Sequence, residues 1–302
     1  MIEIFHVSDL HFGDPLKTEL AKSLLNAVKP LVQTNNNYLL VTGDVTDHGQ
    51  ISEYDLAGGS LNPFAGRIFI TPGNHDYGGG THYIPERARY FDPFAKTLKF
   101  EHEFFYKRVY RCKFETSGGA LVILGLNSCI QEGHKHWGRG EIGESQRAEL
   151  KEILDKKYDA SIPKILFLHH IPNRDAIPAP AMTLIDWELL MDVVGGRVDV
   201  LAFGHQGHRL KVDSEKSRVQ RAAKRPMAVR SIYWGAEGAK KRIWVLDANA
   251  SVEEQACYHI RWNEEGILEE PRIIPFGHDV PVPVPVPSAK KDKSRKKPRR
   301  KQ

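Results

Sequence analysis

The stretch Leu39-Leu40-Val41-Thr42-Gly43-Asp44-Val45-Thr46-Asp47 decides the fold that we expect for this chain. Its first part, with Tyr38 before it, is a short apolar run of the kind that forms a buried strand. Gly43 then permits a sharp turn, and Asp44 comes where the strand ends. Because open α/β sheets bind ligands just beyond the carboxyl ends of their strands, this carboxylate is placed for chemistry.

The same pattern recurs along the chain, where apolar runs are followed by polar side chains at their ends. We expect further strands at Ile2–Val7, Arg67–Ile70, Ala120–Leu126, Lys164–Leu168 and Val198–Phe203. Helical spacing of apolar residues predicts helices at Lys17–Val32, Ile51–Leu61, Glu144–Lys156 and Leu184–Val194. Three later strands, Ser231–Trp234, Arg242–Leu246 and Ala256–Trp262, are expected to complete a second sheet. The aromatic-rich segment from Gly78 to Tyr110 shows no pattern that assigns it.

Composition sets the broad class of the protein. The 302 residues, 41% of them apolar and 27% charged, suit one large globular domain or two small ones. No apolar run approaches the roughly 20 residues of a membrane span, and strand-like Ile2–Phe5 begins without a basic leader. Three scattered cysteines indicate a reducing compartment and no thiolate metal site. We therefore expect a cytoplasmic protein that does not contact a membrane.

The basic charge lies in one place. Residues 288–302 carry a local charge of +8, so the formal net charge of +5 leaves the rest of the chain at −3. The preceding residues 280–287 alternate Val and Pro, which favours an extended spacer. We expect a domain over residues 1–278 and a disordered spacer and tail over residues 279–302. The tail could bind nucleic acid through phosphate contacts, or it could be a solubilising or variable end.

The polar side chains at the strand ends form one candidate site if the strands run parallel. The candidates are Asp9, His11, Asp44, Asn74, His75, His169, His205 and His208. Taken singly, each has an ordinary explanation as a turn former, a helix cap or a satisfied imidazole. Together they offer carboxylate, amide and imidazole ligands, which suit two ions of the manganese, iron, zinc, nickel or cobalt type better than bare magnesium.

These motifs resemble the calcineurin-like metallophosphoesterase superfamily. The order Asp9-x-His11, Gly43-Asp44-x-x-Asp47, Gly73-Asn74-His75-Asp76, His169-His170 and Gly204-His205 is similar to that family's over roughly residues 1–250. The run from Gly43 to Gly49, with Glu53-Tyr54 beyond it, looks most like the class III cyclic-nucleotide phosphodiesterases. The resemblance implies an α/β fold, a four-layer αββα sandwich with a dinuclear metal site between its two sheets.

The resemblance also implies a role for each matching residue. Asp9 and His11 would bind the first metal, and Asp44 would bridge both metals. The second metal would be bound by Asn74, His169 and His205. A hydroxide held between the metals would attack phosphorus in line.

Three further residues are candidates for catalysis rather than for metal binding. His75 would protonate the leaving alkoxide, a general-acid role that imidazole can fill near neutral pH. Asp76 follows it directly and could orient its ring. His170 is a candidate for a phosphate contact or for a structural role beside the metals.

Two departures from the family pattern matter. Position 207 is Gly and His208 comes one residue late, so either the loop bulges at Gly207 and His208 reaches the first metal, or that metal lacks a ligand. Protein Ser/Thr phosphatases of this superfamily carry arginines where this chain has His48 and Pro72. The missing arginines make a phosphoprotein phosphatase a poor expectation.

The leading hypothesis is a metal-dependent phosphoesterase acting on a small phosphodiester, such as a cyclic nucleotide, or on a related ester. The alternatives are a nuclease of the same superfamily and a catalytically silent scaffold with this fold. Residues 134–137 and the tyrosines Tyr77, Tyr83 and Tyr90 could contact a substrate, or they could form a solvated loop and a packed flap.

Overall fold

The arrangement of strands in two sheets defines the architecture. It is seen in a computed structural model that describes residues 1–34, 36–78, 83–116, 119–130, 138–156, 161–173, 182–205, 210–212, 219–221, 227–235, 240–249 and 251–277. No helix of these residues is long and apolar enough to cross a bilayer.

The first sheet is built around β1 (Ile2–Val7), with the strand order β13-β12-β1-β2-β3. The strands β1, β2 (Asn37–Thr42) and β3 (Ile68–Thr71) run parallel. β12 (Ala256–Trp262) pairs antiparallel with β1, and β13 (Arg272–Pro275) pairs antiparallel with β12. The sheet is therefore mixed, and the ends of its three parallel strands lie along one rim.

The second sheet has the order β10-β11-β7-β6-β5-β4. Its parallel strands are β5 (Gly119–Gly125), β6 (Lys164–Phe167), β7 (Val200–Phe203) and β11 (Lys241–Asp247). The antiparallel edges are β4 (Tyr110–Thr116) and β10 (Arg230–Trp234). A separate hairpin pairs β8 (Leu210–Val212) with β9 (Val219–Arg221).

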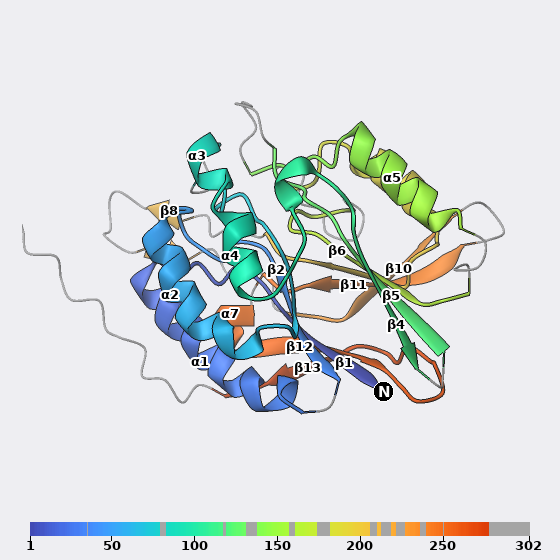
Figure 1. The fold of residues 1–302 in the computed structure, drawn as a ribbon, viewed down its shortest axis with the longest axis horizontal. Coiled ribbons are helices and arrows are strands. Elements are labelled where there is room, and N and C mark those ends of the chain that lie inside the picture. The colour runs from blue at the N-terminus through green and yellow to red at the C-terminus, as the bar shows by residue number, and fades with distance from the viewer. Residues whose placement is uncertain are drawn as a thin grey trace, which may run out of the picture.

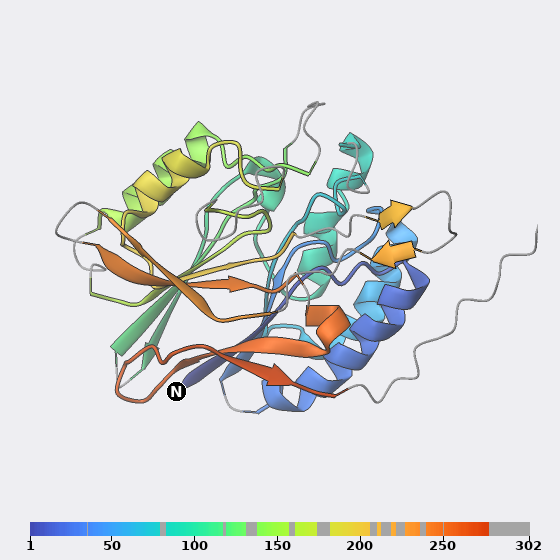
Figure 2. The ribbon, with the colours of Figure 1, turned by 180° about the vertical axis from the view of Figure 1, so that it is seen from behind.

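Helices cover the outer faces of both sheets (Figures 1 and 2). The helices α1 (Pro15–Val32) and α2 (Ile51–Leu61) lie against the first sheet, and α5 (Glu144–Leu154) and α6 (Trp187–Val194) cover the second. The shorter helical segments are η1 (Asn62–Phe64), α3 (Pro85–Ala88), α4 (Phe91–Thr97), η2 (Phe104–Tyr106) and α7 (Ser251–Glu254). The predicted four-layer αββα sandwich is confirmed.

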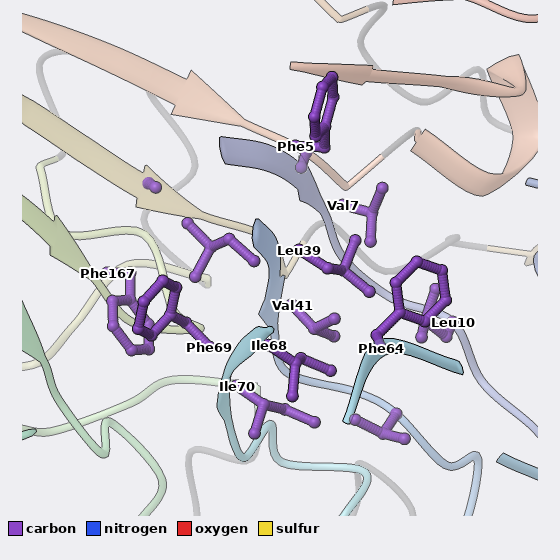
Figure 3. Packing of buried hydrophobic residues seen from close by; sticks show 14 of the residues in the cluster. Phe5, Val7, Leu10, Leu39, Val41, Phe64, Ile68, Phe69, Ile70 and Phe167 are labelled. Carbon is purple, nitrogen blue, oxygen red and sulfur yellow. The ribbon is translucent and has the colours of Figure 1, made fainter. Parts of the chain in front are cut away.

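Successive side chains of a strand point to opposite faces of the sheet, and this alternation explains how the layers pack together. On β6, Ile165 and Phe167 belong to the core between the sheets, whereas Leu166 packs in the cluster that includes Leu150 of α5 and Leu190 of α6. Figure 3 shows part of the core between the sheets, with side chains of β1, β2 and β3 packed together. Each fully buried aliphatic or phenyl side chain contributes about 1.5–3 kcal/mol to folding. Such alternation fixes which face of each strand is buried, and thus the register of the sheets.

Most predicted elements have the expected type, with ends that differ by at most three residues. One expectation was wrong: Ala256–Trp262 does not extend the second sheet but returns to the first, where Trp262 pairs with Ile2. The unassigned segment after Gly78 contains α3, α4 and η2. The predicted boundary between residues 278 and 279 lies outside the described residues, as does the tail, so that division stays a prediction.

Candidate metal centre

Strand ends of both sheets deliver the predicted ligands to one place. Asp9 and His11 follow β1, Asp44 follows β2, and Asn74 and His75 follow β3; His169 and His205 follow β6 and β7 of the other sheet. The candidate site is therefore formed by two facing rims, one from each sheet. Asp9, His11, Asp44, His169 and His205 are all at most 4% exposed, while Asn74 and His75 are half-buried.

Four of these residues have left-handed backbones. The φ angles are 57° at Asp9, 47° at His11, 51° at Asp44 and 67° at His205. Non-glycine residues rarely adopt this conformation, although Asp and His tolerate it better than most. This backbone conformation persists because hydrogen bonds join the loops after β1 and β2. Asp9 N donates to Gly43 O at 3.1 Å, and His11 N donates to Asp44 O at 2.9 Å. Strained backbone of this kind concentrates at functional sites.

One group of side chains that could hold a metal ion, here called the second cluster, gathers four atoms that carry lone pairs. His169 Nε2 lies 2.9 Å from His205 Nδ1, 3.1 Å from Asn74 Oδ1 and 3.3 Å from Asp44 Oδ1. The opposite nitrogens of the two rings are already used, because His169 Nδ1 donates to Thr42 O at 2.7 Å and His205 Nε2 donates to Gly138 O at 2.5 Å. The nitrogens that face each other are therefore lone pairs unless one carries a proton. Two hydrogen-bond acceptors at this distance need a cation or a proton between them. These four nitrogen and oxygen atoms therefore fit a metal ion as its ligands.

The other group that could hold a metal ion, here called the first cluster, is assembled around His11. His11 Nε2 lies 3.9 Å from Asp9 Oδ1 and 3.7 Å from Asp44 Oδ2. Its other nitrogen, Nδ1, donates to Asp47 Oδ1 at 3.0 Å, which leaves the Nε2 lone pair facing the two carboxylates. The two oxygens of Asp44 thus point to different clusters, as a bridging ligand requires. His208 lies outside the described residues, so its predicted place in this cluster stays a prediction.

Burial and charge set the protonation of these imidazoles. Burial lowers the pKa of His11 to about 4, and burial with the neighbouring His169 lowers that of His205 to about 4. Burial also acts to lower the pKa of His169, but the Asp44 carboxylate outweighs it and raises this pKa to about 9. In the metal-free protein a proton on His169 therefore takes the position of the cation. His11 and His205 are neutral at pH 7 and can act as ligands.

His75 lies beside both clusters, and its Nε2 has no hydrogen-bond partner among the described residues. Its backbone N donates to Asp44 Oδ1 at 2.9 Å, and its Nδ1 donates to Asp47 O at 2.8 Å. The ring meets that of His11 edge to face, with centroids 4.5 Å apart, and 27% of its side chain is exposed. A ring held through Nδ1 in this way can, when Nε2 is also protonated, donate that proton to a bound substrate.

Asp76 does not orient the His75 ring, so this expectation is corrected. Its carboxylate is fully buried and accepts hydrogen bonds from Thr46 N at 2.9 Å, Thr46 Oγ1 at 2.8 Å and Gly73 N at 2.9 Å. Asp76 thereby joins the loops after β2 and β3, and the group that fixes the His75 ring is Asp47.

His170 is fully buried beneath the second cluster. Its Nδ1 lies 2.8 Å from Ser128 Oγ, and its ring centroid lies 4.1 Å from that of His205. Its Nε2 has no hydrogen-bond partner among the described residues, and His169, His170 and His205 form a further set of close nitrogens. The His170 ring thus packs against the His205 ring and helps to hold it in place. A phosphate contact by His170 stays a prediction.

Sequence reasoning missed the groups that orient the ligands. Asp47 belongs to the quoted motif, so its spacing could have suggested that it holds His11. The carbonyls of Thr42 and Gly138 carry no side-chain signal and could not have been found. Tyr77, a candidate for substrate contact, is 2% exposed and accepts a hydrogen bond from Asn127, so it belongs to the core. Residues 134–137 lie outside the described residues.

Known proteins share this sequence pattern and this fold. The model of a family described as "Calcineurin-like phosphoesterase" matches residues 2–209. A relative from Arcobacter nitrofigilis, named as a probable glycerophosphodiester phosphodiesterase (GpdQ), is 24% identical over 266 residues, which cover 78% of this chain and 89% of the relative.

Two solved structures are similar in fold. NAD nucleotidase of Haemophilus influenzae superposes with a TM-score of 0.52 at 14% identity, over 91% of this chain and 49% of that one. This chain thus spans about half the length of that protein. GAP50 of Plasmodium, titled the anchor in the inner membrane complex, gives 0.50 at 12% identity, over 82% of this chain and 71% of that one. At these identities the likeness concerns the fold alone.

Proposed function

This chain belongs to the calcineurin-like phosphoesterase family, and we propose that it is a two-metal phosphodiesterase. The observation that carries the proposal is the position of the Asp44 carboxylate. Its Oδ1 lies beside His169 in the second cluster, and its Oδ2 lies beside His11 in the first. One carboxylate serving two clusters of lone pairs is the arrangement that two adjacent cations require.

The metal type follows from the donor set. The second cluster offers two imidazole nitrogens, an amide oxygen and a carboxylate, and the first offers an imidazole and carboxylates. Such mixed nitrogen and oxygen ligands suit manganese, iron, zinc, cobalt or nickel. Ions bound here would lower the pKa of water and neutralise the charge that develops on a phosphoryl group.

The residues of the chain supply the remaining steps. Asp44 and the loops that it joins fix the spacing of the two clusters. His75 presents Nε2 to the leaving oxygen and donates a proton to it, while its Nδ1–H stays bonded to Asp47 O. His48 Nδ1 lies 3.3 Å from Asp47 Oδ2 and 3.1 Å from Glu53 Oε1, so this nitrogen is bound to carboxylates and does not replace the two-pronged phosphate contact of an arginine.

Two observations favour diesters over phosphoproteins. The arginine positions of protein phosphatases are occupied by His48 and Pro72, and the relative from Arcobacter has a phosphodiesterase name. A small phosphodiester is therefore the proposed substrate class, with cyclic nucleotides and glycerophosphodiesters as its first members to test.

Two alternatives remain open to experiment. A silent scaffold is suggested by the displaced His208, but a scaffold has no need of buried metal-binding side chains that converge from two sheets. A nuclease is favoured by the basic residues 288–302. Truncation after Pro287 should weaken single-stranded DNA binding and flatten its salt dependence if the tail is a nucleic-acid arm; equal affinities and slopes would remove that support.

The direct test combines metal analysis with a substrate panel. Protein stripped with chelator and reloaded with Mn²⁺ should approach two ions per chain and hydrolyse bis(p-nitrophenyl) phosphate faster than p-nitrophenyl phosphate. Cyclic nucleotides and glycerophosphodiesters then narrow the class, with Asp44→Asn as the inactive control. One ion per chain with full activity would overturn the dinuclear mechanism, and two ions without hydrolysis of any ester would favour the scaffold.

A further inference from the structure

A buried carboxylate lies at the same corner of the molecule as the first metal cluster and has no role in the scheme above. It belongs to Asp247, the last residue of β11, which is 2% exposed. Its Oδ1 accepts hydrogen bonds from Asn249 Nδ2 at 2.6 Å and Asn249 N at 3.2 Å. Its Oδ2 has no hydrogen-bond partner among the described residues. A buried acceptor without a donor is costly, so its presence needs an explanation.

The backbone places Asp247 beside the metal ligands through β7. Asp247 is in register with Phe203, and Ala248 N donates to Phe203 O at 2.8 Å. The next residue of that strand end, Gly204, packs so tightly on Asp9 that a Cβ there would lie 2.4 Å from Asp9 Oδ2. His205 N then donates to the same Asp9 Oδ2 at 3.1 Å. The end of β7, at Gly204, thus lies between Asp247 and Asp9.

A second connection fixes this corner from the other side. Ser8 N donates to Ser251 Oγ at 3.1 Å, and Ser251 Oγ donates to Ser8 O at 3.1 Å. These two hydrogen bonds hold the segment after β11 against Ser8, the residue that precedes Asp9. Burial raises the pKa of Asp247 to about 6, and the charge of Asp9 acts in the same direction, which agrees with their proximity.

We infer that Asp247 is a positioning residue of the first metal site, where its negative charge beside Asp9 strengthens binding of a divalent cation. We assign it a place outside the ligand shell, because Asp247 belongs to none of the groups of ligand atoms within mutual reach among the described residues. The first cluster has three described ligand residues against four in the second, so it gains most from an added charge. Carboxylates outside the ligand shell commonly change metal affinity by about 10- to 100-fold.

The inference rests on the proposed two-metal function, but its test needs no substrate. Stepwise titration of the metal-free full-length protein with Mn²⁺ is compared between wild type and Asp247→Asn by calorimetry. Electron paramagnetic resonance separates singly loaded from coupled dinuclear protein. We expect the weaker binding step of Asp247→Asn to lose about 10- to 100-fold in affinity. The melting temperature of its metal-free form should be equal or higher, because the amide buries no charge.

A matched control removes a different buried carboxylate. Asp92 on α4 accepts from Phe104 N at 3.0 Å and from Phe105 N at 2.9 Å. Asp92→Asn should therefore lower the melting temperature and leave both Mn²⁺ affinities unchanged, which is the opposite pattern. Asp247→Glu, which keeps the charge, should retain the affinity to within about threefold if it folds.

Unchanged Mn²⁺ affinities in Asp247→Asn overturn the inference. So does a metal-free Asp247→Asn protein that melts lower or does not fold, because Asp247 would then be structural. The inference and the proposed function fail separately. A wild type that binds two ions but hydrolyses no ester removes the function and leaves the affinity comparison valid, whereas normal hydrolysis with unchanged affinities removes only the role of Asp247.

Discussion

The two halves of the metal centre are held in different ways. In the second cluster both imidazoles are oriented by backbone carbonyls, those of Thr42 and Gly138. In the first cluster the only described imidazole, His11, is oriented by a side chain, the carboxylate of Asp47. A carbonyl fixed by the fold cannot be removed by substitution or by protonation, whereas a carboxylate can. We therefore expect the second site to bind its ion more tightly and the first to be the adjustable one.

Loss of Asp44 should produce the largest effect, because it is the one residue that both halves share. Asp44→Ala should abolish binding at both sites and reduce hydrolysis by well over about 100-fold, more than the loss of an outer carboxylate. Elemental analysis beside steady-state kinetics measures this. Retention of one tightly bound ion would show that the second half is complete without the bridge.

Loss of His75 should separate chemistry from metal binding. His75→Ala should keep two ions but lose about 10²- to 10⁴-fold in kcat on alkyl diesters, which need a proton on the leaving oxygen. Aryl diesters, whose leaving group departs as a stable phenolate, should lose far less. Equal losses on the two substrates would exclude His75 as the acid.

The pH dependence of metal binding should differ between the halves. The second site must displace the proton of His169, whose pKa is raised to about 9. Its affinity should therefore rise about tenfold per pH unit below pH 9 and then level off. Burial lowers the pKa of His11 to about 4 and raises that of Asp247 to about 6, so the affinity of the first site should change by no more than about twofold above pH 6. Mn²⁺ titrations at pH 6, 7 and 8 check this, and parallel slopes for both steps would contradict it.

Loss of Asp47 should affect only the first half. Asp47→Asn weakens the hydrogen bond that orients His11, so the weaker Mn²⁺ affinity should fall by about 10- to 100-fold while the tighter one is retained. The Asp92→Asn variant again serves as a control for buried carboxylates. A loss at both steps would mean that the halves are not oriented independently.

The sequence predicted the residues better than their orientation. Asp9, Asp44 and His169 could be found because an apolar run ends just before each, and strand ends carry that signal. The ring orientations depend on carbonyls such as that of Gly138, which any residue could supply, so no pattern reveals them. Asp76 was given the wrong role because adjacency to His75 says nothing about where a buried carboxylate points. The return of β12 to the first sheet was also missed, since strand periodicity does not name a partner.

The second cluster draws its ligands from both sheets, with Asp44 and Asn74 on one and His169 and His205 on the other. A bound ion is therefore a cross-link between parts of the chain that are made at different times. The first 116 residues contain the earlier ligands but cannot close the cluster until the later histidines have been synthesised. Ion binding should then favour association of these two parts of the chain by mass action. A chain cut between β4 and β5 should accordingly reassemble from its two fragments more readily with Mn²⁺ than without it.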